Sequence, residues 1–300
     1  MNSQDIPALP DLPCYLNGDF TRLPDAKVSV MDRGFIFGDG IYEVVPIYAG
    51  RPFRFDEHMA RLDRGLAEMR IPNPMSLTEW RQLVDRLTAA YASSQGQALD
   101  AGDQLAYIQV TRGVAMRDHV MLPGLRPTVF AMSNRMSPPS DAVRAEGVAC
   151  VTADDFRWKK AHIKSLSLAG AVLARQIGAD VGAVETVMFR DGFLSEGAAA
   201  NVWVVKDGKV MGPPRDNLVL EGIRYGLIET LSREAGIPFE LRRNTRSEVF
   251  GADELMLSSA TKEVLAITRL DDRPIGNGRP GPIYQKLYAG YQRAKNSSRE

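Results

Sequence analysis

Residues 32–45 read DRGFIFGDGIYEVV, a glycine-rich stretch that leads directly into a run of strand-forming residues. The glycines first suggest a phosphate-binding loop, but no Gly-Lys-Ser/Thr follows them, and the next segment favours a strand over a helix. A tight turn that feeds a β-strand is therefore the better interpretation. A nucleotide-binding oxidoreductase is also disfavoured, because no GxGxxG follows a strand and opens a helix.

The segments around this turn predict an α+β arrangement. Apolar side chains recur at helical spacing over residues 55–69, and a second helix is predicted from Ser76, which forms a capping box with Glu79. Residues 104–112 alternate in the manner of a strand, and residues 126–132 are predicted to pair with them. Strands and helices thus share the N-terminal part of the chain.

A break in this pattern divides the chain into two predicted domains. Residues 134–142 include a proline pair and show no periodicity, so we expect the linker there. This places a small α+β domain at residues 1–133 and a larger domain at residues 143–300.

The larger domain begins with a predicted strand, followed by a helix over residues 166–178 whose apolar stripe comprises Leu166, Gly170, Leu173 and Ile177. Asp-Gly pairs at 191–192 and 207–208 predict two hairpins. A further helix is expected over residues 222–236, and the segments that follow it predict strands at 253–259 and 264–270 and a helix at 282–295.

Composition excludes several classes of protein. The 300 residues are 44% hydrophobic and 25% charged, with 37 basic and 37 acidic side chains, so no basic excess points to nucleic acid or to an anionic membrane. No apolar run reaches the roughly 18 residues that a membrane span needs. Cys14 and Cys150 form no CxxC pair, and His58, His119 and His162 show no metal-ligand spacing. A cytoplasmic protein without a metal is expected.

Two sets of residues are candidates for chemistry in the middle of the chain. Arg117 and His119 lie two positions apart beyond a strand, so in an extended loop both could address one carboxylate. Lys164 precedes an apolar helix and could be a Schiff-base nucleophile or a solvated helix start. Lys159 and Lys160 are close rivals for that role.

Further candidates lie on both sides of this region. Glu196 follows a hairpin and could be a turn residue or a carboxylate fixed at a sheet end. Ile223 and Arg224 open a helix whose amides could bind an anion, and residues 258–261 offer a second nest of amides and hydroxyls. Arg61 flanks the apolar stripe of its helix and could equally be a surface arginine.

Seven segments, taken in chain order, resemble the fold-type IV pyridoxal-phosphate aminotransferases, and within them the D-amino acid transaminases. They are DRGFIFGDGIYEVV, FDEHMARL, VTRGVAMRDH, IKSLSLAGAVLARQ, LSEGAAANVW, LEGIR and LSSATKEV. The resemblance implies two α/β-type domains with mixed sheets and pyridoxal 5′-phosphate between them. It also implies a homodimer that transfers amino groups between D-amino acids, such as D-alanine or D-glutamate, and 2-oxoglutarate or pyruvate.

The resemblance assigns roles residue by residue. Lys164 would form the aldimine with the cofactor and then move the proton, in a ping-pong reaction, and Glu196 would lie beside the pyridine nitrogen. The positions that would hold the cofactor phosphate are Arg61, Ile223, Arg224, Ser259 and Ala260. The residues that would bind the substrate carboxylate are Tyr42, Arg117 and His119, the last two coming from the partner subunit.

The chain departs from this family at three places. Ala198, Ala199 and Ala200 stand where a serine run is frequent, Arg224 stands where threonine is common, and Ala260 replaces a hydroxyl residue. Other activities of the fold stay open, namely branched-chain L-amino acid transamination, (R)-amine transamination and aminodeoxychorismate cleavage. A non-catalytic cofactor-binding protein is the alternative of another class, which the retained Lys164 and Glu196 disfavour.

Overall fold

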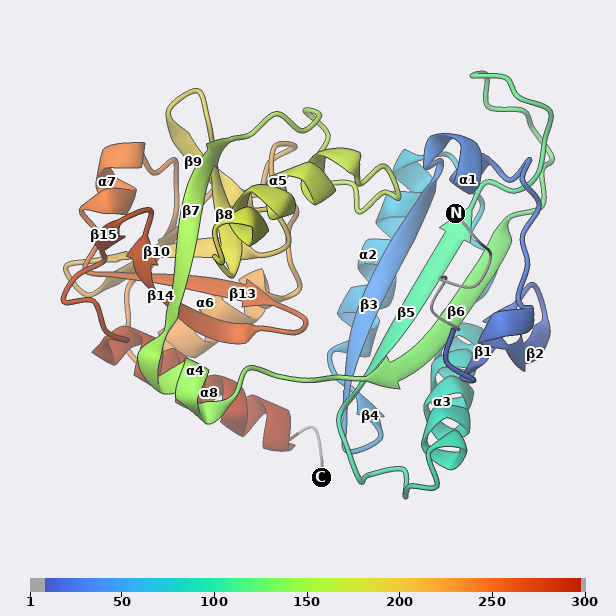
Figure 1. Ribbon diagram of the computed structural model, residues 1–300, viewed down its shortest axis with the longest axis horizontal. Helices are drawn as coiled ribbons and strands as arrows, with labels where there is room; N and C mark the ends of the chain where they lie inside the picture. Colours follow the sequence, from blue (N-terminus) through green and yellow to red (C-terminus); the bar gives the residue numbers. More distant parts are fainter. Residues whose placement is uncertain (1–8, 298–300) are drawn as a thin grey trace. The chain divides into compact units, whose positions relative to one another are not determined.

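The computed structural model describes residues 9–297, which separate into two compact units (Figure 1). The first unit holds the chain up to Met136, and the second begins at Ser137. A short return segment, Lys164–Ser167, belongs to the first unit although the residues on both sides of it belong to the second. The reason is backbone pairing, because the Tyr42 amide donates to the Lys164 carbonyl at 3.1 Å and the Leu166 amide donates to the Gly40 carbonyl at 2.9 Å.

The first unit is built on a six-stranded sheet in which every neighbouring pair is antiparallel. In spatial order, its strands are β2 (Asp19–Arg22), β1 (Pro13–Leu16), β6 (Thr128–Arg135), β5 (Gln104–Thr111), β3 (Gly40–Tyr48) and β4 (Arg51–Pro52). A single turn of 3₁₀ helix, η1 (Leu23–Asp25), follows β2. The two predicted strands are confirmed as β5 and β6, which pair along their whole length.

Two helices pack against this sheet, α2 (Phe55–Glu68) and α3 (Leu77–Ser94), as the apolar spacing predicted. The capping box of Ser76 and Glu79 is present at the start of α3. Burial alternates along the first half of strand β3. Ile41 and Val45 are fully buried on one face, while Tyr42 lies half-buried on the opposite face. The sheet therefore has one face in the core and one face that carries partly accessible side chains.

The glycine-rich turn holds a short helix that the sequence did not predict. Helix α1 (Arg33–Phe37) starts where the Asp32 side chain accepts a hydrogen bond from the Gly34 amide at 2.8 Å. It ends at Gly38, whose φ of 67° is the left-handed conformation that closes helices. The prediction that this stretch feeds a strand is confirmed, since β3 begins at Gly40. The helical turn before it was not predicted, and it forms because a side-chain cap and a glycine stop suffice for one turn.

The second unit contains a mixed sheet. In the described part of the chain its spatial order is β12 (Phe239–Leu241), β11 (Lys209–Gly212), β10 (Asn201–Lys206), β13 (Glu254–Ser259), β14 (Glu263–Leu270), β7 (Val148–Asp154), β8 (Glu185–Arg190) and β9 (Phe193–Gly197), with β15 (Arg273–Pro274) beside β14. Strand β7 runs parallel to both of its neighbours. Both predicted Asp-Gly hairpins are confirmed, with positive φ at each of the four turn residues.

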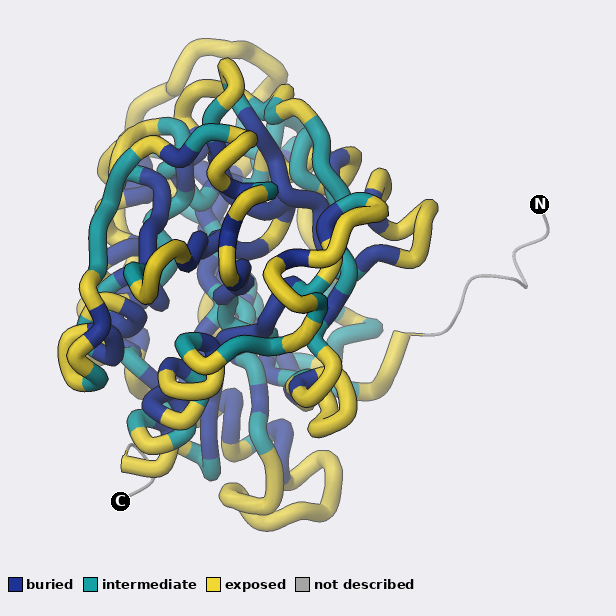
Figure 2. The backbone as a smooth tube through the Cα atoms, turned by 90° about the vertical axis from the view of Figure 1, so that its left-hand side faces the viewer, coloured by how far each residue is buried: buried dark blue, intermediate teal, exposed yellow. Residues whose placement is uncertain are grey.

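Among the described residues, five helices accompany this sheet. Figure 2 shows how buried and exposed stretches of the backbone alternate. The helices are α4 (Asp141–Glu146), α5 (Ala169–Asp180), α6 (Arg224–Glu234), α7 (Arg246–Phe250) and α8 (Pro282–Ser297). The core of the sheet is apolar and includes Val187, Val202 and Leu257, which are fully buried.

The predicted apolar stripe of α5 does not face the core. Leu173 and Ile177 are 61% and 39% exposed, whereas Ala174 is fully buried. Small residues make the contact with the sheet, because a Cβ on Gly178 would lie 2.9 Å from the Thr186 hydroxyl. The helix thus lies close to β8 on its small face and leaves its large apolar face uncovered in a single chain.

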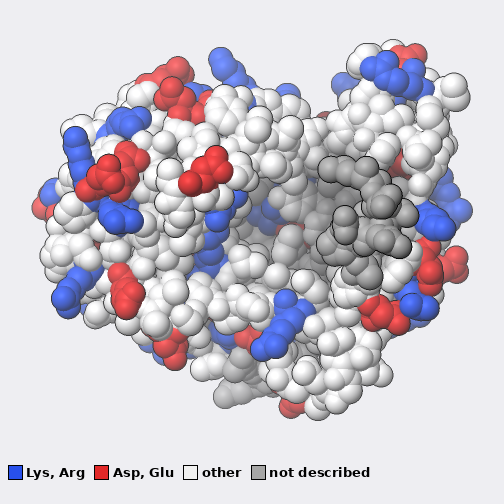
Figure 3. All heavy atoms as spheres, in the orientation of Figure 1, with Lys and Arg blue, Asp and Glu red and all other residues white. Residues whose placement is uncertain are grey.

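Charged side chains of both signs are interspersed over the face drawn in Figure 3. Among the described residues, no helix has the length and apolar character required to cross a membrane.

Gly40→Ala tests the close approach at the start of β3. An added Cβ would lie 2.6 Å from the Val110 carbonyl oxygen and 2.9 Å from the Thr111 Cα, and neither backbone atom can rotate away. We expect a loss of about 1–3 kcal/mol in the free energy of unfolding, measured by urea titration. Gly102→Ala is the control, since nothing lies within 4 Å of its added Cβ, and equal losses in the two variants would contradict this account.

Candidate active site

Lys164 lies against the half-buried face of β3. Its Nζ is 4.0 Å from the centroid of the Tyr42 ring, at the edge where the return segment pairs with this strand. The lysine is half-buried, whereas its rivals Lys159 and Lys160 are both exposed. Of the three candidate lysines, Lys164 is therefore the one whose amine is half-buried and lies against an aromatic ring.

Aromatic and polar side chains continue along this face of the sheet. The Tyr42 ring lies 5.9 Å from that of Tyr107, whose hydroxyl donates to Gln109 Oε1 at 2.8 Å. Burial raises the pKa of Tyr107 to about 12, so its hydroxyl stays protonated. The wall beside Lys164 therefore offers rings and neutral hydrogen-bonding groups.

Arg61 is held on the opposite face of the same strand. Its Nε and one terminal nitrogen donate to the two carboxylate oxygens of Glu43 at 2.9 and 2.7 Å, and His58 Nδ1 lies 3.1 Å from Glu43 Oε1. Burial alone would raise the pKa of Glu43, but Arg61 and His58 outweigh it and hold that pKa well below its usual range. Arg61 is 9% exposed, so it is an oriented, buried cation rather than a surface arginine.

Arg117 and His119 lie on one exposed loop of the first unit. Both face the ring of Phe37 in α1: the Arg117 Cζ lies 5.5 Å from its centroid, and the His119 ring lies 5.3 Å from it. Both side chains belong to exposed residues in the single chain. The loop therefore carries a guanidinium and an imidazole that both contact the Phe37 ring, and both groups can bind a carboxylate.

Glu196 occupies the second unit as a buried carboxyl in β9. It accepts hydrogen bonds from Arg157 at 2.8 Å, from the Leu220 amide at 3.1 Å and from Asn201 Nδ2 at 3.1 Å. Burial raises the pKa of Glu196 to about 7, although the Arg157 guanidinium and the Leu220 amide favour its ionised form. The group is thus poised between its two protonation states near neutral pH.

The anion-site residues differ in their surroundings. Helix α6 begins where predicted, with Ile223 as its N-cap and Arg224 as its first residue. The Arg224 guanidinium is buried and donates to the Tyr291 hydroxyl of α8 at 3.1 Å, so it is directed toward α8. Ser259 ends β13, where its hydroxyl accepts from the Lys262 amide at 3.0 Å, and Ala260 follows it half-buried in the turn.

The family model for class IV aminotransferases matches residues 40–270, which contain every one of these candidate residues. The chain belongs to the class IV aminotransferases. It is therefore an enzyme, and its α+β fold agrees with that family.

Relatives of this class IV aminotransferase cover nearly its whole length. It is 36% identical to a protein named D-alanine aminotransferase from Bacillus licheniformis, over 92% of this chain and 94% of that one. It is 34% identical to the D-alanine aminotransferase of Staphylococcus epidermidis, over 93% and 96%. The branched-chain aminotransferase of Thermoproteus uzoniensis, solved with norvaline, shares the fold, with a TM-score of 0.84, 22% identity and 96% coverage of both chains. Another branched-chain enzyme of this fold, with a TM-score of 0.86 and 21% identity over 97% and 96% of the two chains, was solved with pyridoxamine 5′-phosphate.

Several charged partners in these sites were not found from the sequence. Glu43 and Arg157 form ion pairs with two buried candidate residues, Arg61 and Glu196, yet neither partner was predicted. A signal for Glu43 exists, because it occupies a core-facing position of β3 between Ile41 and Val45, and a carboxylate at such a position requires a buried cation. No comparable signal marks Arg157.

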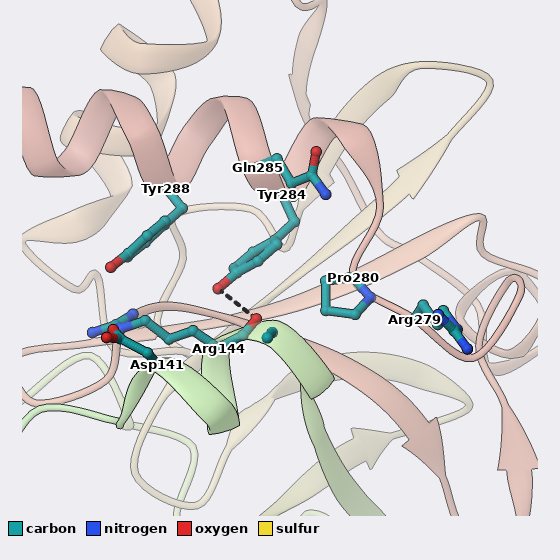
Figure 4. Close-up of a pocket in the computed structure, with 8 residues that line it drawn as sticks. Asp141, Arg144, Arg279, Pro280, Tyr284, Gln285 and Tyr288 are labelled. Carbon is teal, nitrogen blue, oxygen red and sulfur yellow. Dashed lines mark hydrogen bonds between the residues drawn. The ribbon is translucent and has the colours of Figure 1, made fainter.

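A separate pocket lies in the second unit between α4 and the start of α8 (Figure 4). Tyr284 and Tyr288 stack with 5.9 Å between their ring centroids, and the Arg144 guanidinium lies 4.6 Å from the Tyr288 ring. None of the predicted site residues lines this pocket.

Glu43→Gln tests the buried ion pair. The substitution leaves the Arg61 guanidinium buried without a counter-charge, and breaking such a pair from one side typically costs about 3–5 kcal/mol. We expect that loss in the free energy of unfolding measured by urea titration at pH 7. Glu240→Gln is the control, because its ion pair with Lys209 is about 40% exposed and worth at most about 1 kcal/mol. A loss as small as the control's would show that Glu43 does not stabilise Arg61.

The raised pKa of Glu196 predicts a pH dependence of stability in the cofactor-free protein. Between about pH 4.5 and 7 the unfolded carboxyl is ionised while the folded one keeps its proton, so stability falls as the pH rises. Glu196→Gln removes this titration. The stability of the wild type relative to that variant should therefore decline across the window, with a slope of at most about 1.4 kcal/mol per pH unit. A rising or flat difference would show that Arg157 keeps Glu196 ionised throughout.

Proposed function

We propose that this enzyme transfers the amino group of D-amino acids, such as D-alanine or D-glutamate, to a 2-oxo acid such as 2-oxoglutarate or pyruvate. The observation that carries this proposal is the Arg117–His119 pair on the Phe37 ring, since a substrate carboxylate needs such partners and an amine without a carboxylate does not. The relatives named D-alanine aminotransferase, at 34% and 36% identity, support the same branch.

Pyridoxal 5′-phosphate is the cofactor of this family, and each unit by itself carries side chains that suit one part of it. A half-buried amine at Lys164, a buried carboxyl at Glu196 and a buried cation at Arg61 match an aldehyde, a ring nitrogen and a phosphate, respectively. When bound, this cofactor supplies an electrophilic carbon and a ring that withdraws electrons from the substrate. The amides of Ile223 and Arg224 and the turn at Ser259 and Ala260 would add donors for the phosphate.

Each residue then has a chemical task. Lys164 would bind the cofactor and move a proton at its Nζ during the exchange. Glu196, with a pKa of about 7 set by burial, would hold a proton at the ring nitrogen. Tyr42, whose ring contacts the Lys164 amine, would join Arg117 and His119 in binding the substrate carboxylate.

A homodimer would complete this site. Arg117 and His119 are exposed in one chain, as are their apolar neighbours Met116 and Val120 at 79% and 62%. The uncovered face of α5 adds a further apolar surface of the kind that subunit contacts bury. These features support a second copy of the chain as the partner, with Arg117 and His119 contributed across the interface.

The deciding experiment is chiral. The holoenzyme is given D-alanine or L-alanine with 2-oxoglutarate, and both the pyruvate and the handedness of the glutamate are measured. Pyruvate from D-alanine alone, with D-glutamate as the second product, is the expected result. Turnover of branched-chain L-amino acids in place of D-alanine would establish the activity of the branched-chain relatives. Catalytic release of pyruvate from aminodeoxychorismate, with no amino acceptor present, would indicate the lyase.

Arg117→Ala separates a carboxylate contact from a structural role. Losing a charge-assisted contact in a partly desolvated site costs about 2–5 kcal/mol, or roughly 30- to 4,000-fold in kcat/KM. We expect that loss for D-alanine and D-glutamate, and no loss for an (R)-amine that lacks a carboxylate. If the variant slows both substrate types by one factor, Arg117 does not bind the carboxylate.

A further inference from the structure

A buried cluster of three charged residues lies beneath the loop that carries Arg117 and His119. Arg112 donates to both oxygens of Asp39 at 2.7 and 2.9 Å, and Arg33 Nε donates to one of them at 2.8 Å. The three residues are between 3% and 7% exposed. Arg112 also donates to the carbonyls of Met69 and Arg70 beyond the end of α2, which fixes it in place. Asp39 is thus fully satisfied by Arg112, and Arg33 is the additional cation.

Arg33 also donates a side-chain hydrogen bond outside this cluster. A terminal nitrogen donates to the Asp118 carbonyl oxygen at 2.5 Å, across 85 positions of the sequence. Asp118 is the residue between Arg117 and His119. In the described part of the chain, this is the one hydrogen bond that joins residues 116–127 to residues outside that segment. The Val120 amide bonds to the Asp118 side chain, which lies within the segment.

The same helical turn supplies the surface on which the two side chains rest. Arg33 and Phe37 lie four positions apart on α1 and therefore share a face. The Phe37 ring contacts the Arg33 guanidinium at 4.9 Å, in addition to Arg117 and His119. The base of the loop is anchored separately, since the Arg33 amide donates to the Gly113 carbonyl at 2.9 Å. Only the tip depends on the side chain of Arg33.

We infer that Arg33 is a positioning residue, which holds the Arg117–His119 tip on Phe37 and so sets the affinity for substrate carboxylates. This inference rests on the proposed function of that pair. A guanidinium suits the role because its planar fork can donate to the Asp39 carboxylate and the Asp118 carbonyl together. Without this bond the exposed loop would have to become ordered at each binding event. That entropic cost weakens binding.

Arg33→Lys is the sharpest test. It keeps a cation beside Asp39, but a single ammonium lacks the fork that reaches both partners. We expect KM for D-alanine to rise about tenfold with kcat within about twofold, since the cost of ordering the freed loop falls on substrate binding and not on the later chemistry. In an Arg117→Ala background the same substitution should have almost no further effect on D-alanine, because the two residues act as a unit.

The matched control is Arg144→Lys, which alters an arginine in a buried ion pair with Glu263 in the second unit and contacts none of the site residues. It should leave KM unchanged. Phe37→Leu provides a second route to the same result if Arg33→Lys folds poorly, because it removes the ring platform and keeps the ion cluster.

A measurement that needs no substrate separates the positioning role of Arg33 from the proposed D-amino acid transamination. The chain has three histidines, so the His119 ring signals can be assigned by NMR with a His119→Gln variant. In the wild type they should carry the ring-current shift of Phe37, and Arg33→Lys should move them toward the values of a free histidine. Loss of that shift in a protein that never accepts D-alanine would refute the proposed function and uphold the role of Arg33. An active wild type whose KM and His119 signals do not respond to Arg33→Lys would overturn this inference.

Discussion

Burial of carboxylates along and beside β3 is the constraint on which the first unit depends. Glu43 lies within the strand and Asp39 just before it, and an unpaired charge in either place would cost about 3–5 kcal/mol, a large part of a domain's net stability. Each therefore requires a guanidinium from elsewhere in the chain. Glu43 is met by Arg61 from α2, and Asp39 by Arg112 after β5. These pairs fix how the helix and the strands lie around β3, and they orient the cation that suits a phosphate.

Two buried glutamates, Glu43 in the first unit and Glu196 in the second, have pKa values shifted in opposite directions by their neighbours. Glu43 faces Arg61 and His58, which outweigh burial and keep its pKa low, so it is a permanent anion that orients a cation. Glu196 is also buried, but burial dominates there and raises its pKa to about 7 despite Arg157. A permanent anion serves structure, whereas a carboxyl near its titration point suits the exchange of a proton with a ring nitrogen.

The structure shows what surrounds the residues at which this class IV aminotransferase departs from the family pattern. Arg224 stands where threonine is common in the family. Its guanidinium donates to the Tyr291 hydroxyl of α8, so this side chain does not simply replace a threonine hydroxyl. Ala198 and Ala200 are buried, so the missing serines leave small apolar groups in the packing of the second unit.

The sequence by itself determined the periodic elements and the order of the family segments. Helices α2, α3 and α6 and both Asp-Gly hairpins followed from spacing, caps and turn residues, because those signals act over a few neighbouring positions. Only the tertiary structure decided what lies between distant positions. It paired Arg61 with Glu43, brought Arg33 to Asp118, returned Lys164–Ser167 to the first unit and turned the apolar face of α5 outward. The reason is that ion pairs and close backbone contacts join residues far apart in the chain, and no local pattern records which partner each buried charge will find.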